Sequence, residues 1–378
     1  MHATTPHPDT GAATGLRSPL QPSARIRIAP ATHAEPALLQ LPGAHMHLME
    51  NAHDFYPSVA RALQRAGSER ILYAYPDPQY KTLKAAIAQD MATTPDHIAV
   101  AAGSSELIDR ALRLFCTAGD AIVTTQPTWS FFDAFVRRWQ LVPTQVPMKG
   151  SLQHGDLQHD LPGLLAAITP RTRLVYLANP CNPTGSTLAP RALEAFVENL
   201  PAHVVTVVDE AYLPYADEDR RPALAALVDR SAARLILLRT FSKFFGLAGL
   251  RVGHAVASPD TVQLLSHAEI PFAVGAPAVV AAEAALADIA FRQQVFDANQ
   301  RGRRQLLAGL AALGLPAQAS QTNFVLFRPP VAPKTVRDDL RQLGLVLPHV
   351  HPFFDGCAML TVGRPEHNEL ILDYLGGL

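Results

Sequence analysis

The chain has 378 residues, of which 48% are hydrophobic and 17% are charged. These proportions are typical of a globular protein, and the length predicts a large hydrophobic core divided between two domains. The 32 basic and 33 acidic residues nearly cancel, which excludes a general electrostatic attraction to nucleic acid or to an anionic membrane. The three cysteines show no CxxC spacing, which argues against a disulfide framework or a zinc site. We therefore expect a cytoplasmic protein with no metal.

The N-terminal segment, residues 1–38, is rich in Pro, Ala, Thr and Ser and is predicted to form a loosely ordered tail. The most apolar long stretch is Val274–Ala290, which Pro277, Glu283 and Asp288 interrupt. It falls short of the roughly 20 consecutive apolar residues that a membrane-spanning helix needs. We expect neither a membrane nor a nucleic acid as a partner.

Between residues 70 and 265, short apolar runs alternate with helical patterns. Runs that are apolar throughout are typical of strands buried on both faces of a parallel sheet. The predicted strands are Ala121–Thr125, Arg173–Ala178, Val204–Asp209, Arg234–Arg239 and His254–Ala257. Helices are predicted over Ser105–Phe115 and Ala189–Leu200. This βαβα alternation predicts an α/β fold, with a three-layer αβα large domain built on a mainly parallel sheet.

Residues 39–69 and 266–378 are assigned to a smaller α+β domain. Its longest element is a predicted helix over Pro277–Leu313, broken near the middle. The elements that follow are a strand at Thr322–Arg328, a helix at Thr335–Leu343, and strands at Leu345–Leu347 and Ala358–Gly363. That order predicts an open sheet, antiparallel or mixed.

Two glycine- and proline-containing segments lie where predicted strands end, and ligands bind there in open α/β sheets. The segment AAGSSELI, Ala101–Ile108, places Ser104 and Ser105 at the start of a helix, which suits a phosphate group. An ordinary helix cap is the alternative. In NPCNPTG, two Asn-Pro pairs predict a stiff turn that fixes the Asn182 amide, and a turn without chemistry is the alternative.

Two further segments carry ionisable groups. Asp209 ends the apolar strand VVTVVD, where a buried carboxylate needs a cation or hydrogen-bond donors, and Tyr212 follows three residues later. A solvated acid at an exposed strand end is the alternative. In RTFSKFFGLAGLRVG, phenylalanines flank Lys243, and apolar surroundings lower a lysine pKa as a Schiff-base lysine requires. A surface lysine would leave Thr240, Ser242 and Arg251 in the same segment unexplained.

The ordered set AGSSE, NPCNPTG, DEAY and TFSKFFGLAGLRVG resembles the fold-type I pyridoxal-phosphate aminotransferases of class I/II. More narrowly, it is similar to the histidinol-phosphate aminotransferase branch. Supporting segments are MEN at Met49–Asn51, YAYPDPQY at Tyr73–Tyr80 and TVGRPEHN at Thr361–Asn368. The resemblance runs in uninterrupted order from about residue 48 to residue 378.

The resemblance implies that pyridoxal 5'-phosphate is the cofactor and that an amino acid or related amine and a 2-oxo acid are the substrates. Lys243 would bind the cofactor and carry a proton between it and the substrate. Asp209 would face the pyridine nitrogen, and Asn182 and Tyr212 would hydrogen-bond the ring oxygen. Trp129 occupies the position of the residue that stacks on the ring.

The phosphate group, by the same resemblance, would lie at the helix start with hydroxyl groups and a guanidinium around it. The residues that match these positions are Ser104, Ser105, Thr240, Ser242 and Arg251. Tyr75 matches a tyrosine that reaches the phosphate from the partner subunit, which implies a homodimer.

The sequence departs from this branch where substrate-binding arginines are expected. Met359 stands at one of these positions, and Leu347 and Pro348 stand around the other. Without guanidinium groups there, bidentate recognition of a phosphate or carboxylate is lost, so we expect a substrate other than histidinol phosphate. The cationic side chains that could compensate are His349, His351 and Arg364.

Two other functions fit the same motifs. A decarboxylase or cyclase of this fold would share every cofactor-binding residue with an aminotransferase. A non-enzymatic sensor domain that binds the cofactor would require an N-terminal helix-turn-helix, and the Pro-rich tail does not contain one.

Overall fold

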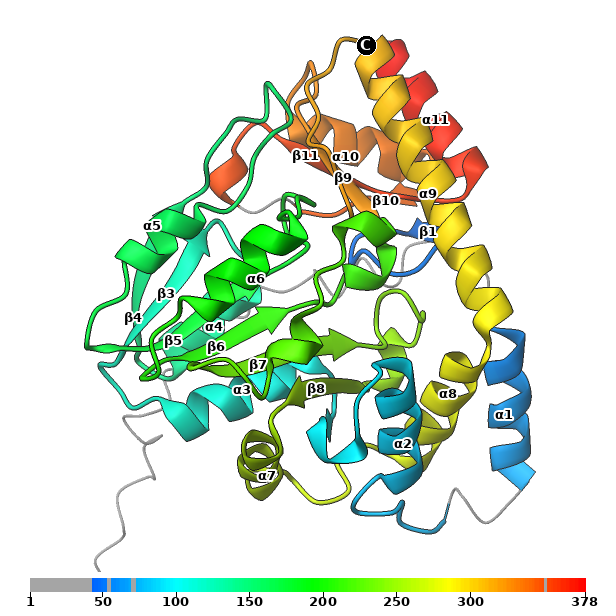
Figure 1. Ribbon diagram of the computed structural model, residues 1–378. Coiled ribbons are helices and arrows are strands. Elements are labelled where there is room, and N and C mark those ends of the chain that lie inside the picture. Colours follow the sequence, from blue (N-terminus) through cyan, green and yellow to red (C-terminus); the bar gives the residue numbers. More distant parts are fainter. Residues whose placement is uncertain (1–42, 53–55, 69–72, 350–351) are drawn as a thin grey trace, which may run out of the picture.

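The computed structural model of the chain describes residues 43–52, 56–68, 73–349 and 352–378 (Figure 1). The predicted N-terminal tail, residues 1–38, lies outside the described residues. None of the helices in the described ranges is long and apolar enough to cross a membrane.

The largest sheet has seven strands in the order β2-β8-β7-β6-β5-β3-β4. Its members are β2 (Ile98–Ala101), β3 (Ala121–Gln126), β4 (Val142–Pro147), β5 (Thr172–Ala178), β6 (Val205–Asp209), β7 (Arg234–Thr240) and β8 (Gly253–Ala257). The strand β8 runs antiparallel to both of its neighbours, and the other pairs are parallel. The mainly parallel sheet predicted from the apolar runs is confirmed.

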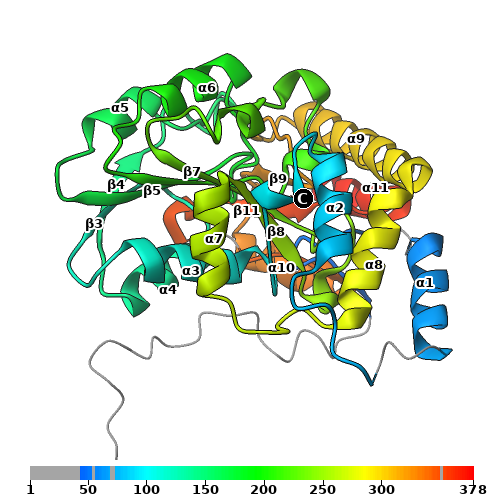
Figure 2. The ribbon, with the colours of Figure 1, turned by 60° about the horizontal axis from the view of Figure 1, so that its bottom comes forward.

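Helices cover both faces of this sheet, as Figures 1 and 2 show. One face packs against α3 (Ser104–Phe115), α4 (Ser130–Arg138) and α7 (Pro259–His267). The opposite face packs against α5 (Leu161–Ala166), α6 (Pro190–Glu198), α2 (Lys81–Asp90) and α8 (Ala276–Ala287). The helix α1 (Pro57–Ser68) packs on α8. These layers form the three-layer architecture expected from the sequence.

Two strands of the sheet were not predicted. The strand β2 contains only four residues, IAVA, and is buried throughout, so it offers neither length nor alternation as a signal. The strand β4, VPTQVP, lies at the edge of the sheet and is mostly exposed. Its two prolines discourage a strand prediction but are tolerated at an edge, where one side of the backbone needs no hydrogen bonds.

The remaining elements form a smaller α+β unit with two separate two-stranded sheets. The strands β9 (Phe324–Phe327) and β11 (Ala358–Thr361) pair antiparallel, while β1 (Ala44–His45) and β10 (Leu345–Val346) pair in parallel. The helices of this unit are α9 (Ile289–Ala312), α10 (Pro333–Gln342) and α11 (Pro365–Gly376). In Figure 1, α9 and α11 lie side by side along one edge. The boundaries between the two predicted domains stay a prediction.

The predicted break in the long C-terminal helix lies at Asp288, between α8 and α9. Its backbone leaves the helical region, with φ −86° and ψ 69°. Its side chain accepts a hydrogen bond from the Phe291 amide at 3.1 Å, so Asp288 caps the start of α9.

Candidate active site

The carboxyl ends of β5, β6 and β7 lie next to one another in the sheet, and the start of α3 lies nearby. Asp209 ends β6 and pairs in register with Ala178, the last residue of β5, and with Leu238 of β7. The motifs that follow these strands are therefore brought together at one edge, as expected for a binding site in an open α/β sheet.

The start of α3 carries free helix-end amides and lies beside a cation. Its first residues are Ser104 and Ser105, and no side chain in the described part of the protein caps it. Arg251 donates from Nη1 to Ser242 Oγ at 3.2 Å, and Thr240 donates from Oγ1 to the same oxygen at 3.0 Å. Amides at the positive end of a helix dipole, hydroxyl groups and a guanidinium are together a strong set of donors for an anion.

Two glycines allow this corner to be so compact. A Cβ on Gly103 would lie 2.6 Å from Arg251 Nη2, and the residue has φ +91°. A Cβ on Gly253 would lie 2.6 Å from the backbone nitrogen of Ser104. Glycine at position 103 therefore leaves room for the Arg251 side chain, and glycine at position 253 lets the start of β8 lie directly against the start of α3.

Asp209 is a buried carboxylate held by two donors. Tyr176 donates from Oη to Asp209 Oδ2 at 2.8 Å, and the Ala211 amide donates to Oδ1 at 3.1 Å. Burial raises the pKa of Asp209, while these hydrogen bonds act in the opposite direction. The sequence alternative of a solvated acid at an exposed strand end is wrong, because Asp209 is 8% exposed.

Lys243 lies in the turn after β7 with its amine among buried groups. Its Nζ donates to the backbone oxygen of Leu48 at 2.5 Å and lies 5.6 Å from the centre of the Tyr212 ring. Burial lowers the pKa of Lys243 from 10.5 to about 8. The neutral, nucleophilic form of the amine therefore becomes the main form above about pH 8, well below the ordinary lysine value of 10.5.

Asn182 and Tyr212 meet above the strand ends. The Asn182 amide donates from Nδ2 to Tyr212 Oη at 3.4 Å. Met49 completes this group: its sulfur lies 3.9 Å from Asn182 Nδ2 and 3.7 Å from Tyr212 Oη. The Asn182 amide and the Tyr212 hydroxyl group therefore lie side by side, and the Tyr212 ring lies near the amine of Lys243.

Trp129 and Tyr75 lie further out. Trp129 precedes α4, on the same side of the sheet as Asp209, and its ring stacks on Phe131 with centroids 5.1 Å apart. The structure does not bring Tyr75 to the other predicted residues of the same chain. Its side chain is 82% exposed and its ring packs against Phe272, with centroids 4.6 Å apart.

The expected substrate arginine positions are apolar and buried. Met359 lies in β11, pairs with Leu326, and is 2% exposed. Leu347 is 3% exposed. Arg364 donates from Nε to the backbone oxygen of Ala52 at 3.3 Å, next to the segment that contacts Lys243. His349 is exposed at a small cavity beside α10, and His351 lies outside the described residues.

Sequence reasoning missed Tyr176, Leu48 and Met49 as members of this group. Within the strand RLVYLA, Tyr176 looks like one more apolar residue. The only sign of a polar role is its hydroxyl group, which needs a hydrogen-bond partner in a buried strand. Leu48 contributes a backbone oxygen, which no side-chain pattern reveals. Met49 belongs to the MEN motif, whose contact with the strand ends depends on the fold.

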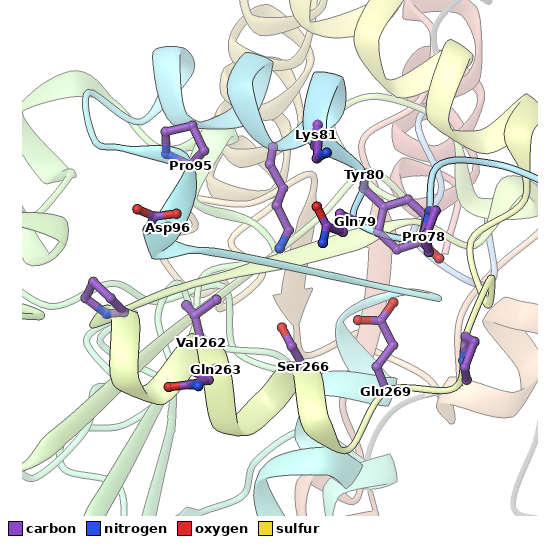
Figure 3. Close-up of a pocket in the computed structure, with 13 residues that line it drawn as sticks. Pro78, Gln79, Tyr80, Lys81, Pro95, Asp96, Val262, Gln263, Ser266 and Glu269 are labelled. Atoms are coloured by element: carbon purple, nitrogen blue, oxygen red, sulfur yellow. The ribbon is translucent and has the colours of Figure 1, made fainter.

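A separate cavity of about 850 Å³ lies between α2 and α7 (Figure 3). Figure 3 shows Tyr80 and Glu269 among the residues that line it. Neither Asp209 nor Lys243 is among its lining residues. This cavity is distinct from the group of residues at the strand ends.

Comparisons with known proteins agree with this geometry. The chain is 34% identical over 336 residues to the aromatic amino acid aminotransferase of Mycobacterium sp. (strain JLS), covering 86% of this chain and 89% of that protein. It is 34% identical over 317 residues to the histidinol-phosphate aminotransferase of Moorella thermoacetica, covering 84% and 80%.

Solved structures give the same result. The crystal structure of histidinol-phosphate aminotransferase from Sinorhizobium meliloti, in complex with pyridoxal-5'-phosphate, superposes with a TM-score of 0.81 at 30% identity. The match covers 90% of this chain and 92% of that one. Residues 46–364 match the family described as aminotransferase class I and II, which confirms the resemblance found in the motifs. The chain belongs to the class I and II aminotransferases.

Proposed function

We propose that this chain is a pyridoxal-phosphate-dependent aminotransferase in which Lys243 binds the cofactor. The observation that carries the proposal is the placement of a lysine of lowered pKa, a buried carboxylate and an anion-binding corner at one edge of the sheet. These are the three kinds of group that an aldehyde, a ring nitrogen and a phosphate require.

The cofactor phosphate would be held by the start of α3 and the hydroxyl groups beside it. The residues proposed for this role are Ser104, Ser105, Thr240, Ser242 and Arg251. Because the cap position of α3 is a glycine without a side-chain cap, its first amides remain available to an anion.

The bound cofactor would supply an electron-withdrawing ring that stabilises negative charge at the substrate α-carbon. Asp209 would accept a hydrogen bond from the ring nitrogen and keep it protonated. Asn182 and Tyr212 would donate to the ring oxygen, and Trp129 would cover one face of the ring. The free amine of Lys243 would take a proton from the substrate α-carbon and return it to carbon C4' of the cofactor, across the nitrogen that joins them.

We further infer a homodimer in which Tyr75 reaches the partner's site. Tyr75 is 82% exposed and Tyr73 is 76% exposed, and Ile270 beside Phe272 is 64% exposed. Exposed aromatic and aliphatic side chains grouped in this way are typical of an interface. Light scattering after gel filtration tests this inference: twice the chain mass is expected, and Tyr75→Arg with Phe272→Glu should shift the protein toward the monomer.

The substrate is proposed to be an amino acid or amine that is less anionic than histidinol phosphate. Met359 and Leu347 leave the expected guanidinium positions apolar and buried. The relatives at 34% identity include both an aromatic amino acid aminotransferase and a histidinol-phosphate aminotransferase. An apolar wall favours the uncharged side chains of the first class.

A single-turnover experiment tests the proposed reaction. The purified holoenzyme is mixed with a panel of amino donors without an acceptor, and the cofactor released on denaturation is identified by chromatography. A transaminase accumulates pyridoxamine phosphate in proportion to the enzyme. A decarboxylase or cyclase releases unchanged pyridoxal phosphate together with a new amine or ring product, and a sensor domain releases pyridoxal phosphate with every donor intact.

A further inference from the structure

We propose that Tyr176 is a positioning residue for Asp209, whose carboxylate it orients through a hydrogen bond and stabilises in the ionised form. This inference rests on the proposed function, because the ionised carboxylate matters only if Asp209 faces the protonated ring nitrogen of the cofactor. Tyr176 would act through Asp209 and would not touch the reacting atoms.

The two side chains face each other from neighbouring strands. Tyr176 lies in β5 opposite Val207 of β6, and Asp209 follows two residues later on the same face of the sheet. The Tyr176 Oη to Asp209 Oδ2 distance is 2.8 Å, which is the usual length of a hydrogen bond between two oxygens. The position of Asp209 in the sheet alone therefore brings its carboxylate to the phenol.

The phenol ring is held in place from the other side. Tyr176 is completely buried, and the Phe132 ring of α4 stacks on it with centroids 3.8 Å apart and planes 11° from parallel. A tyrosine packed in this way cannot turn its hydroxyl group elsewhere without disturbing the core. Phe132 thereby fixes the direction from which Asp209 receives its hydrogen bond.

The hydrogen bond has a defined direction. Burial and the neighbouring Asp209 raise the pKa of Tyr176 well above its ordinary value, so the phenol keeps its proton and donates it. Burial raises the pKa of Asp209, and the Tyr176 and Ala211 hydrogen bonds counteract that rise. The other charged groups acting on Asp209 are Glu210, which raises its pKa, and Lys243, which lowers it.

Tyr176→Phe removes the donor and keeps the stacked ring. The matched control is Tyr215→Phe, because Tyr215 is also buried and its hydroxyl group has no hydrogen-bond partner in the part of the chain that the structure describes. Both variants lose one buried hydroxyl group, and only Tyr176→Phe removes a hydrogen bond to Asp209.

The first readout is the titration of Asp209 itself, followed by NMR in the cofactor-free protein labelled with carbon-13 at aspartate carboxyl groups. Asp209→Asn identifies its signal. In Tyr176→Phe the midpoint is expected to rise by about one to two pH units, while Tyr215→Phe leaves it unchanged. An unchanged midpoint in Tyr176→Phe, or an equal rise in Tyr215→Phe, overturns the proposal.

The second readout is the pH profile of kcat/KM in the holoenzyme. Tyr176→Phe should move the acidic limb to higher pH by a similar amount. If Tyr176→Phe does not fold, 3,5-difluorotyrosine placed at position 176 provides a stronger donor and should move both midpoints to lower pH. A chain that titrates as expected but never binds pyridoxal phosphate would refute the proposed function and leave the Tyr176–Asp209 relationship intact.

Discussion

The amine of Lys243 donates a 2.5 Å hydrogen bond to the backbone oxygen of Leu48, 195 residues earlier in the chain. The bond links the turn after β7 to the segment that follows β1. Asn51 strengthens the link by donating from Nδ2 to the backbone oxygen of Phe244 at 2.9 Å, and Asn323 donates to the backbone oxygen of Met49 at 3.0 Å. Residues 48–51 are thus tied to the turn that carries Lys243.

Replacing Lys243 tests its assignment as the cofactor-binding residue. Lys243→Ala should abolish turnover and the visible absorbance of the bound cofactor, because the amine that forms the covalent bond is removed. The measurement is the mass of the protein after borohydride reduction, which should increase by one reduced cofactor in the wild type only. Lys149→Ala, at an exposed lysine paired with Asp160, is the control and should behave as the wild type. Normal turnover in Lys243→Ala would disprove the assignment.

The lowered pKa of Lys243 predicts a pH dependence. Because this pKa falls from 10.5 to about 8 on folding, the unfolded chain binds one more proton between these two values. The stability of the cofactor-free protein should therefore rise with pH across this interval relative to Lys243→Met, which has no proton to bind. Urea unfolding at pH 7 and pH 10 measures the difference.

The titration of the Lys243 amine should also appear in the rate of covalent cofactor binding. The rate at which the cofactor-free protein takes up pyridoxal phosphate covalently should increase with pH and level off above about 8, where the amine is neutral. A rate that continues to rise to the ordinary lysine value near 10.5 would show that burial does not act on this amine.

The elements that the sequence predicts correctly are those with strong local signals. Continuous apolar runs indicated five strands of the central sheet, and the motif residues at their ends were brought to one edge. The strand β4 was missed because its prolines and exposed residues fit an edge position that only the sheet topology defines.

The site residues that the sequence did not predict were missed for a similar reason. Tyr176 and Asp209 lie 33 positions apart in the sequence, and the bond between them depends on the parallel register of β5 and β6. No local pattern encodes that register. The contact of Lys243 with a backbone oxygen is likewise independent of the side chain at position 48.

Gly253 offers a test of the anion-binding corner that removes no polar group. A Cβ at this position would lie 2.6 Å from the backbone nitrogen of Ser104 and 2.8 Å from the backbone carbon of Gly103, so the start of α3 must move. Overpacking of this kind costs about 1–3 kcal/mol. We expect Gly253→Ala to weaken pyridoxal phosphate binding about tenfold or more, measured by fluorescence titration of the cofactor-free protein.

The control for this variant is Gly249→Ala, four residues earlier. A Cβ on Gly249 meets nothing within 4 Å among the described residues, and its backbone is not in the left-handed region. Its cofactor affinity should equal that of the wild type. Equal affinities in both variants would mean that the close approach of Gly253 to Ser104 does not position the phosphate site.

The buried, apolar positions of Met359 and Leu347 predict which substrates the protein prefers. Each lost charge-assisted hydrogen bond is worth about 1.5–3 kcal/mol, or roughly ten- to a hundredfold in affinity. With Met359 and Leu347 buried at the expected arginine positions, kcat/KM for histidinol phosphate should be well below that for histidinol or an aromatic amino acid. Arg364 is exposed and donates a hydrogen bond to the backbone oxygen of Ala52, four residues after Leu48, whose backbone oxygen accepts the hydrogen bond from Lys243. Arg364→Ala should therefore reduce kcat/KM for carboxylate-bearing donors more than for simple amines, whereas Arg341→Ala, which removes an exposed arginine paired with Asp338, should change neither. Preferential use of histidinol phosphate by the wild type would show that other cations recognise the phosphate, and equal losses for both donor types in Arg364→Ala would exclude that residue from carboxylate recognition.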